Sequence, residues 1–322
     1  MPGSSSTHGA RLLLAALWTA ALIPAASALE RRAPSLDPAR PPDQTRIWMR
    51  NLVLFPYPDV PVSVSELSGT VRPTREGRPV TLDDVSSYEI PVEHAAVTLS
   101  ARDMTILMDR HILPIGHSPI KHVDVSFNEG SISMSGTMVK VGVPVPFTAT
   151  ATIVPTQEGD MRVHITAMHA GDIVPKGIMD ALGLKLSNIA QPANRRAFHL
   201  EGDDMVVPLV SMFPPPLFLG RLSAVRVTPS GLLATIGQPG GSELPDIQAK
   251  SFLLMRGGTV VFAKKLTMRD ADMAMVPLDP QRDLGFSPEH YYQQMVEGET
   301  RSRPDYALVA HVKDFRDLGS GR

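Results

Sequence analysis

The stretch that most constrains the fold is SARDMTILMDRHILPIGHSPIKHVDVSFNEGSISMSG, residues 100–136. Its first half has the apolar period of an α-helix, in which Met104, Leu107, Met108 and Ile112 share one face. Ser100 stands where a helix N-cap is expected, and Pro114 stands where the helix should end. The first half therefore predicts a capped amphipathic helix.

The second half of the stretch predicts a β-hairpin. Residues 122–128 and 131–135 alternate apolar and polar side chains around a turn at Asn128-Glu129-Gly130. Residues 141–153 and 163–167 alternate in the same way around the turn at 157–160, so we expect them to pair as antiparallel strands. Their inner row runs from Phe147 to the small Ala149, which leaves room for a helix or an acyl chain.

Residues 200–237 resemble residues 99–136 at a separation of about 100 residues. Asp204-Met205 corresponds to Asp103-Met104, and the later valines and glycines correspond as well. We therefore predict a second helix–hairpin unit, whose helix Pro208 must shorten or kink. Another helix is predicted at residues 172–189.

The composition excludes several classes of function. The 322 residues carry 31 basic and 33 acidic side chains, and 5% are aromatic, so a nucleic-acid-binding surface is not expected. The chain has no cysteine, which excludes disulfides, thiolate metal sites and cysteine nucleophiles. No G-x-S-x-G elbow, P-loop or His-Glu-x-x-His motif is present, so we expect neither an enzyme nor a cofactor.

The N-terminus has the pattern of an export signal. An apolar run at 12–23 is followed by Ala26-Ser27-Ala28, a small–x–small cleavage site. We predict a signal peptide at 1–28 and a periplasmic or secreted protein; an uncleaved membrane anchor is the alternative. A disordered linker at 29–45, a main domain at 46–237 and a C-terminal extension at 246–316 complete the predicted organisation. The extension is expected to hold a hairpin at 252–262, a helix starting near Ser287 and a strand at 306–312, packed on the same domain.

Two groups of polar side chains have the donor atoms of metal sites, and either site would suggest a metal-dependent hydrolase. The groups are His111, His117 and His122, and Asp270, Asp272, Asp279 and Asp283. The competing reading has His111 at the negative end of the helix dipole and the other side chains in solvent. The irregular spacing favours that second reading, so no metal site is expected.

Methionine is the remaining signal, because many of the 16 methionines fall on apolar stripes. Methionine is flexible and polarizable, so it either fills irregular gaps in a core or lines a surface that adapts to apolar ligands. Short amphipathic helices facing strands with small inner residues can leave an apolar groove between them.

With these features, residues 92–237 resemble the LmeA-like phospholipid-binding proteins of bacterial cell envelopes. The resemblance rests on the helix–hairpin unit, on FTATATIVPTQEGDMRVHI at 147–165 and on VRVTPSGLLATIG at 225–237. That family is similar to the tubular lipid-binding (TULIP-like) superfamily. The resemblance implies a long curved antiparallel sheet around short helices, and lipid binding or transfer without catalysis. This chain departs from the family pattern at Pro208, and the resemblance does not extend beyond Gly237.

We therefore expect an α+β protein, TULIP-like, with two helix–hairpin pseudo-repeats, that holds a phospholipid or fatty acyl chain in an apolar groove. A membrane surface or an envelope protein is a possible further partner. The alternative is a structural or adaptor module of the envelope with a filled core and a protein partner. The expected groove residues are Met104, Leu107, Met108, Ile112, Phe127, Met134, Phe147, Met205, Leu209 and Phe213.

Overall fold

The computed structural model describes residues 44–113, 120–140, 143–170, 199–201, 204–238, 244–245, 247–302 and 307–319. The predicted signal peptide, the predicted helix at 172–189, Pro114 and His117 lie outside the described residues. By its contacts the chain separates into residues 1–39 and residues 40–322, and the fold below is that of the second unit.

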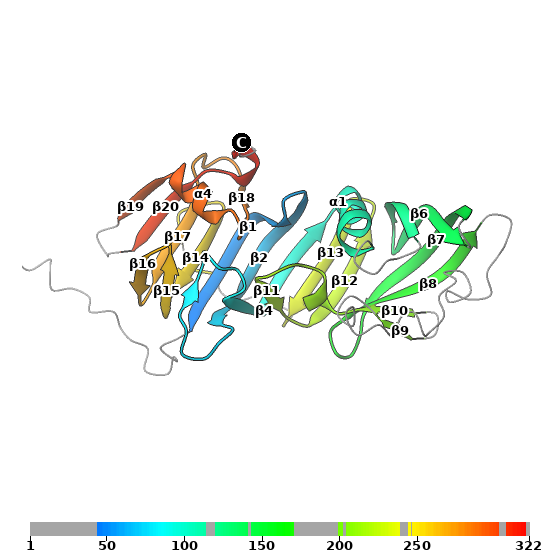
Figure 1. Ribbon diagram of the computed structural model, residues 1–322, viewed down its shortest axis with the longest axis horizontal. Coiled ribbons are helices and arrows are strands. Elements are labelled where there is room, and N and C mark those ends of the chain that lie inside the picture. Colours follow the sequence, from blue (N-terminus) through cyan, green and yellow to red (C-terminus); the bar gives the residue numbers. More distant parts are fainter. Residues whose placement is uncertain are drawn as a thin grey trace, which may run out of the picture. The chain divides into compact units, whose positions relative to one another are not determined.

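The described residues are mostly strand, as Figure 1 shows, so the sheet-rich α+β prediction is confirmed. The largest sheet has 11 strands, nine of them in the order β12-β13-β4-β2-β1-β14-β17-β20-β19. Along this path the strands are β12 (Leu222–Thr228), β13 (Gly231–Gly237), β4 (Tyr88–Leu99), β2 (Val60–Pro73), β1 (Thr45–Tyr57), β14 (Phe252–Arg256), β17 (Asp272–Pro277), β20 (Leu308–Val312) and β19 (Glu299–Ser302). Two short strands pair in parallel beside the path, β11 (Leu217–Leu219) with β4 and β18 (Leu284–Phe286) with β1.

The C-terminal strands continue the sheet that the N-terminal strands begin. β1 pairs with β2 on one side and with β14 on the other. The predicted hairpin at 252–262 is wrong, because β14 pairs with β17 while β15 (Thr259–Phe262) pairs with β16 (Leu266–Arg269). Gly257 and Gly258 both have positive φ and separate the two strands. β15 instead forms a three-stranded sheet with β16 and β3 (Val80–Thr81).

The second sheet has six antiparallel strands in the order β5-β6-β7-β8-β10-β9. Their bounds are β5 (Ile120–Asn128), β6 (Ser131–Lys140), β7 (Val143–Pro155), β8 (Met161–Ala170), β10 (Asp204–Val207) and β9 (His199–Glu201). The predicted hairpin at 122–135 and the predicted pairing of 141–153 with 163–167 are confirmed by β5–β6 and β7–β8.

The described helices are short. They are α1 (Ala101–Ile106), the π-helical η1 (Leu107–Ile112), the 3₁₀ helices η4 (Leu209–Ser211) and η5 (Phe315–Asp317), and α4 (Tyr291–Val296). None of these described helices is both long and apolar enough to cross a membrane. The predicted start of the last helix at Ser287 is displaced, because residues 288–290 form a turn and α4 begins at Tyr291.

The predicted second helix at Met205–Phe213 is wrong. Residues 204–207 form strand β10, in which Met205 pairs with Val163 of β8, and only the short η4 follows. The β-branched Val206 and Val207 favour a strand, and Pro208 has no N–H to continue a helix. The hairpin of the second unit does form, as β12–β13, but it belongs to the 11-stranded sheet while β5–β6 belongs to the six-stranded sheet.

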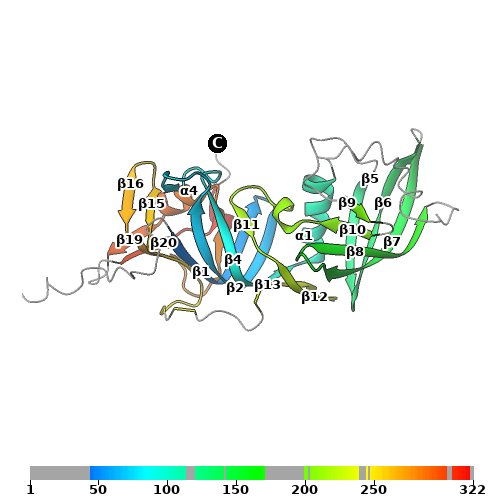
Figure 2. The same ribbon diagram turned by 90° about the horizontal axis from the view of Figure 1, so that it is seen from below.

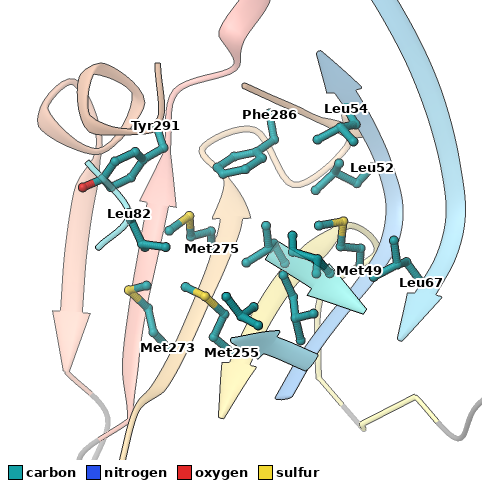
Figure 3. Packing of buried hydrophobic residues seen from close by; sticks show 14 of the residues in the cluster. Met49, Leu52, Leu54, Leu67, Leu82, Met255, Met273, Met275, Phe286 and Tyr291 are labelled. Carbon is teal, nitrogen blue, oxygen red and sulfur yellow. The ribbon is translucent and has the colours of Figure 1, made fainter. Parts of the chain in front are cut away.

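The described residues form three hydrophobic cores: two large ones, and a small one of β14 and β17 side chains. The first lies on the 11-stranded sheet, where Met49, Met255 and Met275 come together from β1, β14 and β17 (Figure 3). These methionines are 1–2% exposed, so here methionine fills a core. The second core joins α1 and η1 to the six-stranded sheet and to parts of β2, β4, β12 and β13. The expected groove residues fall in this second core.

Candidate ligand-binding site

The helical wall of the candidate site begins at Ser100. Its hydroxyl accepts the N–H of Asp103 at 3.2 Å, which satisfies one donor that a helix start leaves free. The apolar stripe then turns Met104 and Leu107 inward, where they are 6% and 0% exposed. The sequence prediction of a capped helix with this buried face is confirmed.

The end of the helical wall is wider than an α-helix. In η1 the Leu113 N–H donates to the carbonyl of Met108, five residues back, at 2.9 Å. Such π-helical turns occur frequently at functional sites. Met108 and Ile112 lie on this turn, half-buried against the apolar face of the sheet.

Two polar side chains of the helical segment formed by α1 and η1 bind this segment to the sheet. β5 is an edge strand of the six-stranded sheet, and α1 lies beside it, as Figure 2 shows from below. Thr105 Oγ1 accepts the N–H of Val125 at 2.9 Å, and Asp109 Oδ1 accepts the N–H of Val123 at 3.1 Å. The helix side chains thus take the place of a neighbouring strand and fix the distance between helix and sheet.

The sheet wall has small residues at its centre and large ones around them. Ala149 of β7 lies opposite Met134 on β6 and Met168 on β8, and it is 6% exposed. The next inward residue, Ala151, lies opposite Ile132 and Ile165. These cross-strand rows place small side chains between larger ones, and Ala151, like Ala149, is buried at 4% exposed.

One margin of this wall is an aromatic ring over a glycine. Phe147 lies opposite Gly136, and a Cβ at Gly136 would be 2.9 Å from the ring atom Cε1. Any larger residue at position 136 would push the ring away from the strand. Glycine is therefore needed for the ring to lie close over β6.

The structure brings all ten expected groove residues into one hydrophobic cluster. Four are buried: Met104, Leu107, Phe127 and Phe147. Six are half-buried and pack against the cluster: Met108, Ile112, Met134, Met205, Leu209 and Phe213. The last three reach it from β10, η4 and the residues just after η4, and not from the predicted second helix.

Sequence analysis missed several half-buried members of the cluster, which are Ile120, Ile165, Met168 and Ala170. The register between β7 and β8 shifts between Thr150 and Ala151, and this irregularity moves the inward face of β8 from odd to even residue numbers. A search for strict alternation therefore loses the strand near Ala167, although β8 continues to Ala170.

A polar group formed by Asp59, Arg110 and His111 borders the cluster; Arg110 and His111 belong to η1. His111 Nε2 lies 2.7 Å from Asp59 Oδ1, and Arg110 donates to Asp59 Oδ2 at 3.0 Å. The His111 ring stacks on Tyr57 with centroids 3.8 Å apart. Burial alone would raise the pKa of Asp59, but the hydrogen bonds from His111 and Arg110 hold that pKa below its usual range. No sequence signal links residues 52 positions apart, so this group was not predicted.

The two polar groups weighed as metal sites do not assemble where the structure describes them. His111 is engaged by Asp59, and His122 is exposed with a positive φ of 54°. Asp272 pairs with Arg256, and Asp283 pairs with Lys250. Among the described residues, no three His, Asp or Glu side chains lie close enough together to hold a metal ion.

Comparison of the chain with protein-family models, with curated protein sequences and with solved structures finds no match.

Proposed function

We propose that this protein binds a lipid acyl chain between η1 and the apolar face of the six-stranded sheet, without catalysing a reaction. The observation that carries the proposal is the group of half-buried apolar side chains gathered there from the helix and from the strands. Met108 and Ile112 represent the helical side, and Met134 and Met168 represent the sheet side. Flexible, half-buried apolar side chains on both walls are what an acyl chain can cover.

The energy of such binding comes from area and needs no specific polar contact. Burying a chain of roughly 16 carbons at ~0.8 kcal/mol per methylene contributes about 12 kcal/mol before the costs of association. We propose a TULIP-like arrangement for this part of the chain and a place outside the cytoplasm, in the periplasm or secreted. The support for export is the signal-like pattern at residues 1–28.

A second candidate is a structural or adaptor module of the envelope. It is favoured by the packing of the four buried residues of the hydrophobic cluster. Leu107 and Phe147, for example, are 0% and 3% exposed, as expected in a filled core. In this case the cluster holds the helix on the sheet, and the function lies in a protein partner.

The first experiment is extraction of the purified full-length protein with organic solvent, followed by mass spectrometry of the extract. A titration with a fluorescent phospholipid and a fluorescent fatty acid accompanies it. Lipid binding predicts a co-purified lipid or saturable binding of one of the two probes. A clean extract together with no binding of either probe would overturn the proposal.

The Met108→Trp variant separates the two candidate functions. In an open groove the indole occupies the ligand's place, so binding falls while stability changes little. In a filled core the added bulk lowers the free energy of unfolding by about 1–3 kcal/mol. Leu233→Trp is the matched control, because Leu233 is 41% exposed on β13 and lies outside the cluster.

A further inference from the structure

An open apolar cavity lies away from the candidate site, between the β15–β16 hairpin, helix α4 and strands β19 and β20. Its volume is about 510 Å³, within the range of roughly 300–1,000 Å³ that is typical of small-molecule sites. None of the ten expected groove residues lines it. The lining residues are Phe262, Ala263, Leu266, Thr267, Met268, Tyr292, Met295, Val296, Thr300 and Leu308.

Two walls of this cavity expose large aliphatic side chains. Leu266 on the hairpin is 57% exposed, and Val296 at the end of α4 is 63% exposed. Single exposed aliphatic residues are common on protein surfaces, but these two line one hollow together with Met268 and Met295. An apolar ligand in this hollow would remove all four from water.

The turn of the hairpin forms the rim of the cavity and has an unusual backbone. Ala263 and Lys264 have positive φ values of 48° and 68°, a region that residues with a Cβ rarely adopt. The Ala263 N–H donates to Tyr291 Oη at 3.0 Å, and the Lys264 N–H donates to Asp83 Oδ2 at 2.8 Å. These two hydrogen bonds hold the turn in a conformation that costs free energy.

The result of this conformation is a cation at the rim. Lys264 Nζ lies 4.9 Å from the ring centroid of Tyr292, which itself lines the cavity. Lys265 follows and is also exposed. Neither lysine has an ion-pair partner among the described side chains, and the nearby Asp83 is engaged by the backbone of Lys264. The rim therefore offers positive charge beside an apolar hollow.

We propose that this cavity binds a single-chain amphiphile with an anionic head group, its chain in the hollow and its carboxylate or phosphate beside Lys264. A free fatty acid and a lysophospholipid share this chemistry, and either is compatible with the charge and the lining. The proposal does not depend on the lipid site between η1 and the six-stranded sheet, because the two sites share no residue.

The test is isothermal titration calorimetry of the full-length protein with laurate, with lauroyl-lysophosphatidylglycerol and with uncharged dodecanol, which have chains of equal length, each below its aggregation concentration. We expect saturable binding of at least one of the two anionic probes, at least tenfold tighter than that of dodecanol. The comparison between laurate and lauroyl-lysophosphatidylglycerol identifies the source of the ligand. No binding of either anionic probe, or equal binding of the uncharged alcohol, would overturn the proposal.

Variants locate the binding. Val296→Asp and Lys264→Glu should each weaken the anionic probe at least tenfold. Their matched controls, Val143→Asp and Lys121→Glu, change an exposed valine and an exposed lysine on the six-stranded sheet and should bind as wild type. Thermal unfolding checks that all four proteins are folded. Unchanged affinity in both Val296→Asp and Lys264→Glu would contradict binding in this cavity. If Met108→Trp weakens binding in that case, the ligand binds at the site between η1 and the six-stranded sheet, and the proposed function stands.

Discussion

Asp314 shows how one buried carboxylate organises the C-terminal part of the chain. Its side chain is 6% exposed and accepts the Gly285 N–H at 2.9 Å and the Arg316 N–H at 2.8 Å, with the Arg316 guanidinium beside it. Gly285 has to be glycine, because a Cβ there would lie 2.5 Å from Asp314 Oδ1. One side chain therefore joins β18 to the start of η5.

The Asp314 contacts predict a dependence of stability on pH. Burial alone would raise the pKa of Asp314, but hydrogen bonds from Arg316 and from the Gly285 N–H hold that pKa below its ordinary value of 3.8. The ionised form therefore stabilises the fold above about pH 3.8, and this stabilisation is lost as the pH falls through the lower pKa of the folded state.

Urea unfolding between about pH 6 and about pH 2 measures this effect. We expect Asp314→Asn to be less stable than wild type near neutral pH and to lose less stability on acidification. Asp270→Asn is the control, because Asp270 is an exposed turn residue with a positive φ that asparagine also tolerates. Parallel curves for wild type and Asp314→Asn would show that the ionisation of Asp314 does not contribute to the pH dependence.

At the scale of elements, the helix of residues 101–112 and the hairpin after it act as one unit. Thr105 and Asp109 accept backbone N–H groups of β5 that would otherwise be unpaired. Thr105→Val keeps the shape of the side chain and removes the acceptor, so the buried Val125 N–H loses its partner. We expect the free energy of unfolding to fall by about 1–3 kcal/mol, measured by urea titration.

Thr148→Val is the matched control for Thr105→Val. Thr148 is exposed on the outer face of β7, where the same change should alter stability by less than about 0.5 kcal/mol. Equal effects of the two substitutions would mean that the hydrogen bond from Val125 to Thr105 does not stabilise the fold.

The sequence predicts most of these elements but not how they are joined. The helix period, the Ser100 cap and the alternation in β5–β8 are local signals, and the structure follows them. The π-helical turn at η1 is not visible in the period, because one extra residue per turn changes the helix only over a few positions. The predicted second helix is wrong because Val206 and Val207 favour a strand and Pro208 cannot continue a helix, whatever the match to Asp103-Met104.

For the candidate site, the sequence predicted which residues come together but not the route by which Met205, Leu209 and Phe213 arrive there. Apolar side chains at helical or strand spacing point to a core, and all ten lie in one. The polar group of Asp59 and His111 depends on a contact between distant segments, which periodicity does not encode.

At the scale of the molecule, the C-terminal strands complete the sheet begun by β1 and β2. Met255 of β14 packs with Met49 and Leu67 in one core, so the N-terminal and C-terminal segments share their buried surface (Figure 3). The sequence predicts residues 246–316 only as an extension, because no local pattern indicates that β14 pairs with β1.

Truncation tests this shared core. A chain ending at Gln238 lacks β14, β17 and β20, which leaves one side of β1 unpaired and its apolar residues exposed. We expect this chain to be insoluble or to lack cooperative unfolding, measured by the soluble fraction on expression and by circular dichroism. A chain ending at Gly319 keeps every described strand and should fold as wild type. A cooperative, soluble 1–238 fragment would contradict the prediction.

The pairing of β1 with β14 also means that, in a newly made chain, β1 is synthesised well before its partner strand. The two strands are about 200 residues apart in sequence, and a ribosome adding about 5–20 residues per second needs on the order of 10–40 s to cover that distance. During this interval the β1–β2 hairpin has an open edge rich in apolar side chains. A holding chaperone, or passage across a membrane before folding, would protect this edge until β14 has been synthesised.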